Sequence, residues 1–125
     1  MALSAKKLME VESALKEGGL MDAADTIEEH TRGDYYSVGQ QVRGWYYFTK
    51  ERVIFISGWG VRSFSIKYTD ILELKKSFVG LFFPFGITVT ANDPENGKPN
   101  KYKFSLNSRK HWIELLVTKS GAKLL

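Results

Sequence analysis

The chain has 125 residues, of which 43% are apolar and 26% charged, and it contains no cysteine. This length corresponds to about one domain, and the composition is too apolar for a disordered chain. Without cysteine the chain forms neither a disulfide framework nor a thiolate nucleophile or thiolate metal site. No stretch approaches the roughly 20 apolar residues of a transmembrane helix. We therefore expect one small folded domain.

The net charge of +4 is unevenly distributed along the chain. Residues 1–40 contain four Lys and Arg against eight Asp and Glu, whereas residues 41–125 contain fourteen against six. The basic part is compatible with an anionic partner, and the asymmetry is equally compatible with packing of the two parts against each other. The N-terminus lacks the apolar run of a secretory signal, so we expect a cytoplasmic protein, peripheral to a membrane where it binds lipid.

The first predicted element is an amphipathic helix over residues 4–17. Ser4 is placed to cap its start, and Gly18-Gly19 supplies the left-handed stop. One narrow apolar stripe recurs at helical spacing: Leu8, Val11 and Leu15. A narrow stripe predicts that this helix lies on a larger body.

From residue 26 onward, β-branched and aromatic residues between turn formers predict about seven strands. The predicted strands cover residues 26–32, 40–49, 53–56, 62–68, 70–77, 87–91 and 102–106. The first is polar enough for a sheet edge, and Gly33-Asp34 is expected to end it. The fourth alternates most clearly, with Phe64, Ile66 and Tyr68 on one face.

The last predicted element is a helix over residues 108–119, with Ser108 as its cap and Gly121 after its end. Three of its apolar side chains share one face: Trp112, Leu115 and Leu116. Strands followed by a helix indicate an antiparallel sheet with a segregated helix. We predict a mainly β (α+β) fold, a barrel of about seven antiparallel strands capped by this C-terminal helix, with the N-terminal helix added to it.

An ordered set of motifs resembles a known family over about three-quarters of the chain. The residues are Asp34-Tyr35-Tyr36-Ser37, 44–55, 64–71, 86–90, 102–106 and 109–113. They resemble the GRAM branch of the pleckstrin-homology (PH) superfold, together with bacterial PH-like domains. The resemblance implies a strongly bent sheet closed by a C-terminal helix, with residues 20–125 as the domain and residues 1–19 as a helical extension. It also implies an adaptor-like module that binds phosphoinositides, other membrane lipids or proteins.

One departure from the lipid-binding pattern lies in the first predicted strand. Phosphoinositide-binding PH domains place several Lys and Arg there, whereas residues 26–34 contain three carboxylates and one arginine. This composition argues against inositol-phosphate binding at that place.

The sequence offers no machinery for catalysis. His30 and His111 are its two histidines, and nucleophile-elbow, Walker A and Rossmann motifs are absent. Glu28, Glu29 and His30 would alternate between faces in an extended strand, so they do not converge on a metal ion. We predict a protein that is not an enzyme and has no catalytic residue, metal site or cofactor.

The segment 78–85 is rich in large apolar residues and lies between two predicted strands. As a loop tip it would insert into a membrane interface or dock in a partner's groove. The alternative is that it folds back to close the barrel or is buried at a dimer contact. Trp59 lies in a predicted turn, where a tryptophan is hard to bury. The predicted interaction surface comprises Trp59, Lys75, Lys76, Leu81, Phe82, Phe83 and Phe85.

We predict a non-catalytic binding module that mediates protein–protein interaction, with another protein or a second copy of itself. The alternative is peripheral binding of anionic lipid or phosphoinositide through Phe82–Phe85 and the adjacent lysines. Two basic groups are candidates for an exposed face: Arg43, Lys50, Arg52, Arg62 and Lys67, and Lys98, Lys101 and Lys103. No RNA-binding motif accompanies them, which argues against a nucleic-acid partner.

Overall fold

A computed structural model describes residues 3–37, 40–58, 62–79 and 83–125. The elements are α1 (Ala5–Glu17), β1 (Ile27–Ser37), β2 (Gln40–Thr49), β3 (Arg52–Ser57), β4 (Ser63–Lys67), the 3-10 turn η1 (Tyr68–Asp70), β5 (Ile71–Val79), β6 (Phe83–Asn92), β7 (Pro99–Ser105), α2 (Arg109–Ser120) and β8 (Lys123–Leu124). The predicted helices and the second to seventh predicted strands agree with these elements to within a few residues.

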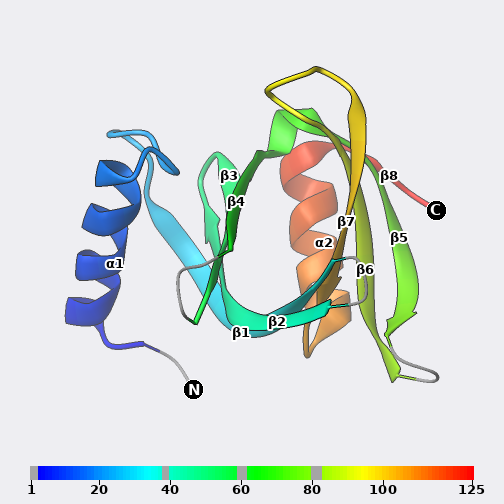
Figure 1. The fold of residues 1–125 in the computed structure, drawn as a ribbon, viewed down its shortest axis with the longest axis horizontal. Helices are drawn as coiled ribbons and strands as arrows, with labels where there is room; N and C mark the ends of the chain where they lie inside the picture. Colours follow the sequence, from blue (N-terminus) through cyan, green and yellow to red (C-terminus); the bar gives the residue numbers. More distant parts are fainter. Residues whose placement is uncertain (1–2, 38–39, 59–61, 80–82) are drawn as a thin grey trace.

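Eight strands form one sheet in the order β4-β3-β2-β1-β7-β6-β5-β8. All neighbours are antiparallel except β5 and β8, which run parallel. The sheet is folded into a U, with α2 between its arms and α1 outside one arm (Figure 1). The mainly β architecture with a C-terminal helix is thus confirmed, but the sheet is open and, within the described residues, contains one strand more than the expected barrel.

The strands β1 and β2 curve together through the base of the U (Figure 1). Gly33 and Gly44 lie opposite each other at this curve. A Cβ on Gly44 would lie 2.2 Å from the carbonyl oxygen of Ile56, and one on Gly33 would lie 2.4 Å from Leu106. Because no side chain fits at either position, the backbones approach each other closely and the hairpin turns from one arm to the other.

The prediction that Gly33-Asp34 ends the first strand was wrong, whereas its placement at a sheet edge holds for residues 27–32, which pair only with β2 among the described residues. The strand β1 continues through the curve to Ser37. Beyond the curve Asp34, Tyr35 and Tyr36 pair with β7, so this end of β1 lies in the middle of the sheet. The glycine that resembles a strand terminator in the sequence is a bend inside a longer strand.

The concave face of the U holds the main core. Its largest fully buried side chains include Tyr46, Phe48, Phe55, Leu74, Ile87, Phe104, Leu106 and Leu116. The indole of Trp112 stacks on Phe48 at 4.6 Å between ring centroids. Trp112 and Leu116 of α2 therefore cover the core as predicted. Gly121 ends α2 with a φ of +69°, but the Ser108 side chain makes no capping hydrogen bond, so that part of the prediction was wrong.

A smaller apolar cluster joins α1 to the convex face of the sheet. Its buried members are Leu15, Met21, Tyr47 and Ile54, and its partly buried members include Leu8, Val11 and Trp45. The Ser4 hydroxyl accepts a hydrogen bond from the Lys7 backbone N–H at 3.2 Å, as predicted for a cap. The predicted apolar stripe of α1 therefore packs against the outside of the first arm.

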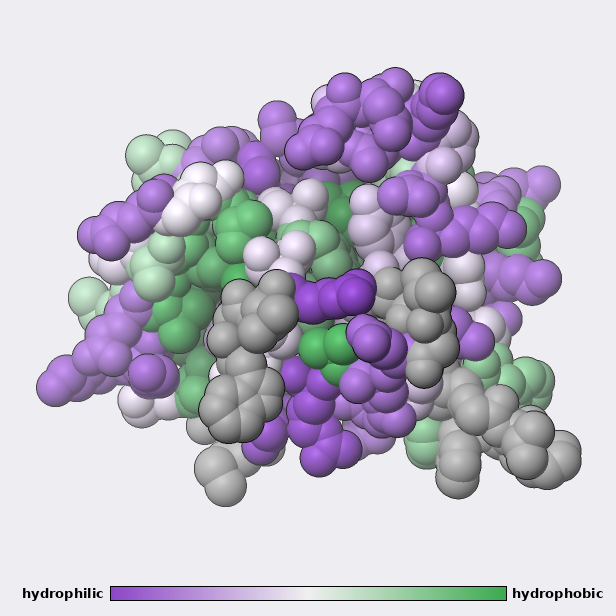
Figure 2. Space-filling model, viewed as in Figure 1, coloured by the Kyte–Doolittle hydropathy of each residue, from purple (hydrophilic) through white to green (hydrophobic). Residues whose placement is uncertain are grey.

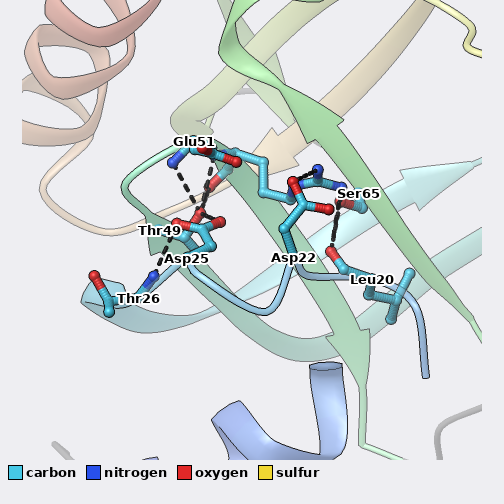
Figure 3. A network of polar contacts seen from close by, with 8 residues as sticks. Leu20, Asp22, Asp25, Thr26, Thr49, Glu51 and Ser65 are labelled. Carbon is cyan, nitrogen blue, oxygen red and sulfur yellow. Dashed lines mark hydrogen bonds and ion pairs between the residues drawn. The ribbon is translucent and has the colours of Figure 1, made fainter. Parts of the chain in front are cut away.

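A buried polar network fixes the linker between α1 and β1 (Figure 3). Arg52 forms an ion pair with Asp22 at 3.1 Å and donates to the Ser65 hydroxyl at 3.1 Å. The Thr49 hydroxyl donates to the buried carboxylate of Asp25 at 2.6 Å. Arg52 is 8% exposed, so it does not belong to an exposed basic face as expected.

Candidate functional site

The predicted interaction segment lies at the tip of the β5–β6 hairpin. Val79 of β5 pairs with Phe83 of β6, so the connection is shorter than the expected loop. Phe83 begins β6. Leu81 and Phe82 of the predicted surface, and Trp59 of another hairpin, lie outside the described residues.

The described part of this hairpin exposes both charge and apolar surface. Lys75 and Lys76 of β5 are exposed. Phe78 is 61% and Phe85 39% exposed, although both are large apolar residues. Phe78 belongs to the apolar segment 78–85 that the sequence singles out, but it was absent from the predicted site residues. The structure thus brings Lys75, Lys76 and Phe85 together on one hairpin.

The strand β5 has a partly free edge. It pairs with β6 along most of its length, but with β8 only at Glu73 and Leu74. Backbone groups of a strand point alternately to its two sides. The N–H of Leu125 donates to the Leu74 carbonyl at 2.8 Å, so Leu74 faces β8, and Lys76 faces the same way. Within the described residues no strand pairs with Lys76 on that side.

Apolar side chains lie at both ends of this free edge. Phe78 lies at one end, and at the other Leu72 is 45% and Leu124 42% exposed. An unpaired edge with exposed apolar side chains is a template for pairing with another chain. Lys75 and Lys76 oppose pairing with most other strands, because a partner strand must supply negative charge opposite them.

A second candidate region is a hollow at the base of the U. It has a volume of about 380 Å³ and is lined by Arg32, Gly33, Asp34, Arg43, Phe85, Ser105 and Asn107. A neighbouring hollow of about 480 Å³ shares Arg32 and Arg43 and adds Gln41, Val42 and Gly58. Hydrophilic side chains gather across the lower middle of this face in Figure 2. Most of these residues were not predicted, because they meet only through the pairing of β1 with β2 on one side and with β7 on the other.

The carboxylate of Asp34 organises the wall of this hollow. It accepts hydrogen bonds from Gln41 and from Arg43 Nε, the latter at 3.4 Å. Beneath it the Tyr46 hydroxyl donates to the Asp34 carbonyl at 2.8 Å. The pKa of Tyr46 is raised well above its ordinary value, first by burial and then by the charges of Tyr35 and Asp34.

The described residues offer little for a metal site or a membrane-spanning helix. Among them, no three His, Asp or Glu side chains are grouped to hold a metal ion. Neither α1 nor α2, the helices described, is long and apolar enough to cross a membrane. His111 lies 2.7 Å from Glu29 on the exposed surface, joining α2 to β1.

Comparison with known proteins shows the fold. No protein-family model and no curated protein matches this sequence. The C-terminal domain of an unknown protein from Leishmania infantum superimposes with a TM-score of 0.71 at 17% identity, over 88% of this chain and 97% of that one. The Vps36 N-terminal PH domain gives 0.60 at 13% identity, over 81% of this chain and 83% of that one.

A further similar structure is that of human RhoA in complex with the DH/PH fragment of PDZRhoGEF. Its TM-score is 0.68 at 11% identity, with coverage of 92% of this chain and 38% of that one. Identities this low show a shared fold alone. The chain therefore has a PH-like fold, and folds of this kind support many unrelated functions.

Proposed function

We propose that this PH-like domain is a non-catalytic module that binds another protein by pairing an extended segment of it with the free edge of β5. The observation behind this proposal is the Lys76 backbone, whose N–H and C=O face away from β6 where no described strand pairs with them. Strand addition of this kind takes affinity from main-chain hydrogen bonds and specificity from alternate side chains.

The side chains along the edge define the partner's chemistry. Exposed Lys75 and Lys76 favour a segment with acidic residues, and exposed Phe78 favours an apolar residue beside them. The proposed binding unit is residues 20–125, with residues 1–19 as an extension, acting in the cytoplasm. The similar DH/PH fragment forms a complex with a protein, RhoA, which is compatible with this class of function.

The test is a proline substitution that removes one edge donor. By alternation the Lys76 N–H faces the free edge, whereas the Lys75 N–H faces Thr88 of β6. Lys76→Pro should leave the sheet folded, because proline is tolerated on the free side of an edge strand. Lys75→Pro is the matched control and should destabilise the sheet, since it removes a hydrogen bond within the β5–β6 ladder.

Binding is measured with peptides selected from a displayed library of random sequences. We expect the selected peptides to be extended and acidic. Lys76→Pro should weaken their binding at least about tenfold without changing the midpoint of urea unfolding. Peptides that bind Lys76→Pro as tightly as the original chain would contradict strand pairing. Co-sedimentation with anionic vesicles that is lost in the Phe82→Ser, Phe83→Ser double variant would instead support the lipid-binding alternative, in which Phe82–Phe85 and the adjacent lysines enter a membrane interface.

A further inference from the structure

The hollow at the base of the U contains hydrogen-bond donors that the fold does not use. Arg43 engages Asp34 through Nε, and Arg32 lies over the Trp45 ring at 5.5 Å. No described residue accepts a hydrogen bond from the Arg43 terminal amino groups or from the Arg32 guanidinium. The side chains of Ser105 and Asn107 likewise have no partner among the described residues.

These donors come from three strands, β1, β2 and β7, and from Asn107 just after β7, which meet only in the folded protein. Asp34 pairs with Arg43 on one side and with Ser105 on the other, so the three side chains form a row across β2, β1 and β7. Arg32 is opposite Trp45 and therefore diagonal to Arg43. Diagonal neighbours on a sheet lie about 7–8 Å apart, within the joint reach of two arginine side chains around one ligand.

Each arginine also has one orienting contact in the folded protein. The Asp34 carboxylate binds Arg43 at Nε and thereby orients the rest of its guanidinium, and Gln41 occupies the other oxygen of that carboxylate. The Trp45 ring limits the positions of Arg32. Ordered donors lose less conformational entropy on binding than free ones, which favours affinity.

We propose that this hollow binds a single phosphate monoester, with Arg32 and Arg43 as its cationic ligands and Ser105 and Asn107 as neutral donors. A phosphate monoester has a charge of about −1.5 to −2 at pH 7 and three free oxygens that accept hydrogen bonds from several directions. Two guanidinium groups match that charge, and their planar forks bind phosphate in a bidentate manner.

The surroundings favour one phosphate group over a polyphosphorylated headgroup. The Asp34 carboxylate in the wall lowers the net charge of the lining residues to about one positive unit, so one bound phosphate already makes the hollow negative and a second is repelled. The source that the hollow fits best is a phosphorylated side chain of a protein, because its lining is polar apart from Phe85. This site is separate from the β5 edge and does not depend on the strand-pairing proposal.

The test is an NMR titration of the isotope-labelled chain with N-acetyl-phosphoserine amide at constant ionic strength. We expect saturable shifts of the Gly33, Asp34, Ser105 and Asn107 amides and of the Arg32 and Arg43 Nε–H signals. The Arg32→Gln, Arg43→Gln double variant should weaken binding at least about tenfold, and Ser105→Ala about twofold to threefold. Thermal unfolding verifies that both variants are folded.

The matched control is Lys67→Gln, Lys101→Gln, which removes the same charge from exposed positions outside the hollow. It should bind the phosphoserine probe as tightly as the original chain. Equal weakening in both double variants would overturn the proposal, since it would indicate general electrostatic attraction. Binding to phosphatidic acid vesicles without binding to the soluble monoester would also overturn it, because the site would then require a membrane surface. Equal affinity for inorganic phosphate and the phosphoserine probe supports the site and assigns recognition to the phosphate group alone.

Discussion

The convex face of the β1–β2 hairpin consists of a half that α1 covers and a half that no described helix covers. Outward side chains along β2 follow the order Tyr47, Trp45, Arg43 and Gln41, from the covered half to the uncovered one. Tyr47 is buried under α1, whereas the Arg43 side chain is 74% exposed. The change from apolar to charged falls at Gly44, where the hairpin bends.

This division shows how one strand serves stability and recognition in turn. An apolar side chain on a sheet face lowers the free energy only when another element removes it from water. Charged side chains contribute little to stability in an exposed position, so they remain available to a ligand. The two halves should therefore respond oppositely to substitution: the covered half in unfolding free energy and the uncovered half in binding.

The largest expected effect is in the covered half. Ile54 of β3 pairs with Tyr47 of the covered half and is fully buried between the sheet and α1. Ile54→Ala should lower the free energy of unfolding by about 3 kcal/mol, because it removes buried methyl groups and leaves a cavity. Arg43→Gln in the uncovered half should change it by no more than about 0.5 kcal/mol. Urea unfolding followed by circular dichroism measures both, and similar losses in the two variants would contradict the division.

A somewhat smaller loss is expected at the boundary between the halves. A Cβ at Gly44 would lie 2.2 Å from the Ile56 backbone oxygen, and the backbone must shift to admit it. Gly44→Ala should therefore cost about 2 kcal/mol. Gly58→Ala is the control, because its Cβ would meet only the Arg43 oxygen at 3.8 Å. If both alanines are tolerated equally, the close approach of the strands does not produce the bend.

The covered half was largely predictable from the sequence, for a local reason. The helical stripe of Leu8, Val11 and Leu15 and the run from Trp45 to Phe48 are visible in short windows. A continuous apolar run indicates a strand buried on both faces. What the run does not specify is which element covers its outer face, and that became clear only from the position of α1.

The uncovered half was not predictable, because it depends on long-range pairing. Arg32, Arg43 and Ser105 are ordinary polar residues of three strands until β1 pairs with β7. That pairing was hidden because Gly33 resembles a strand terminator. Likewise the free edge of β5 follows from the strand order, which a single sequence does not reveal. Trp59, Leu81 and Phe82 remain predictions.

The smallest expected effect is a pH-dependent change in stability from two buried tyrosines, Tyr68 beneath the covered half and Tyr46 beneath the uncovered half. Burial, followed by the charges of Glu28, Asp25 and Glu29, raises the pKa of Tyr68, whose hydroxyl donates to the Thr49 carbonyl at 2.8 Å. The pKa of Tyr46, which lies beneath the uncovered half, is also raised above its ordinary value. Tyr68→Phe should cost about 1 kcal/mol at pH 7, the value of one hydrogen bond.

The sign of the pH dependence follows from the raised pKa values. The folded chain keeps both phenol protons above pH 10, where the unfolded chain releases them, so the unfolded state binds fewer protons and stability falls as pH rises. Tyr68→Phe and Tyr46→Phe should each reduce the steepness of that fall. Absorbance at 295 nm should show whichever of Tyr46 and Tyr68 the variant retains ionising together with global unfolding, because both rings belong to one core. Ionisation of Tyr46 at lower pH than Tyr68 would show that the uncovered half opens by itself, and the hollow would then be a mobile part of the fold.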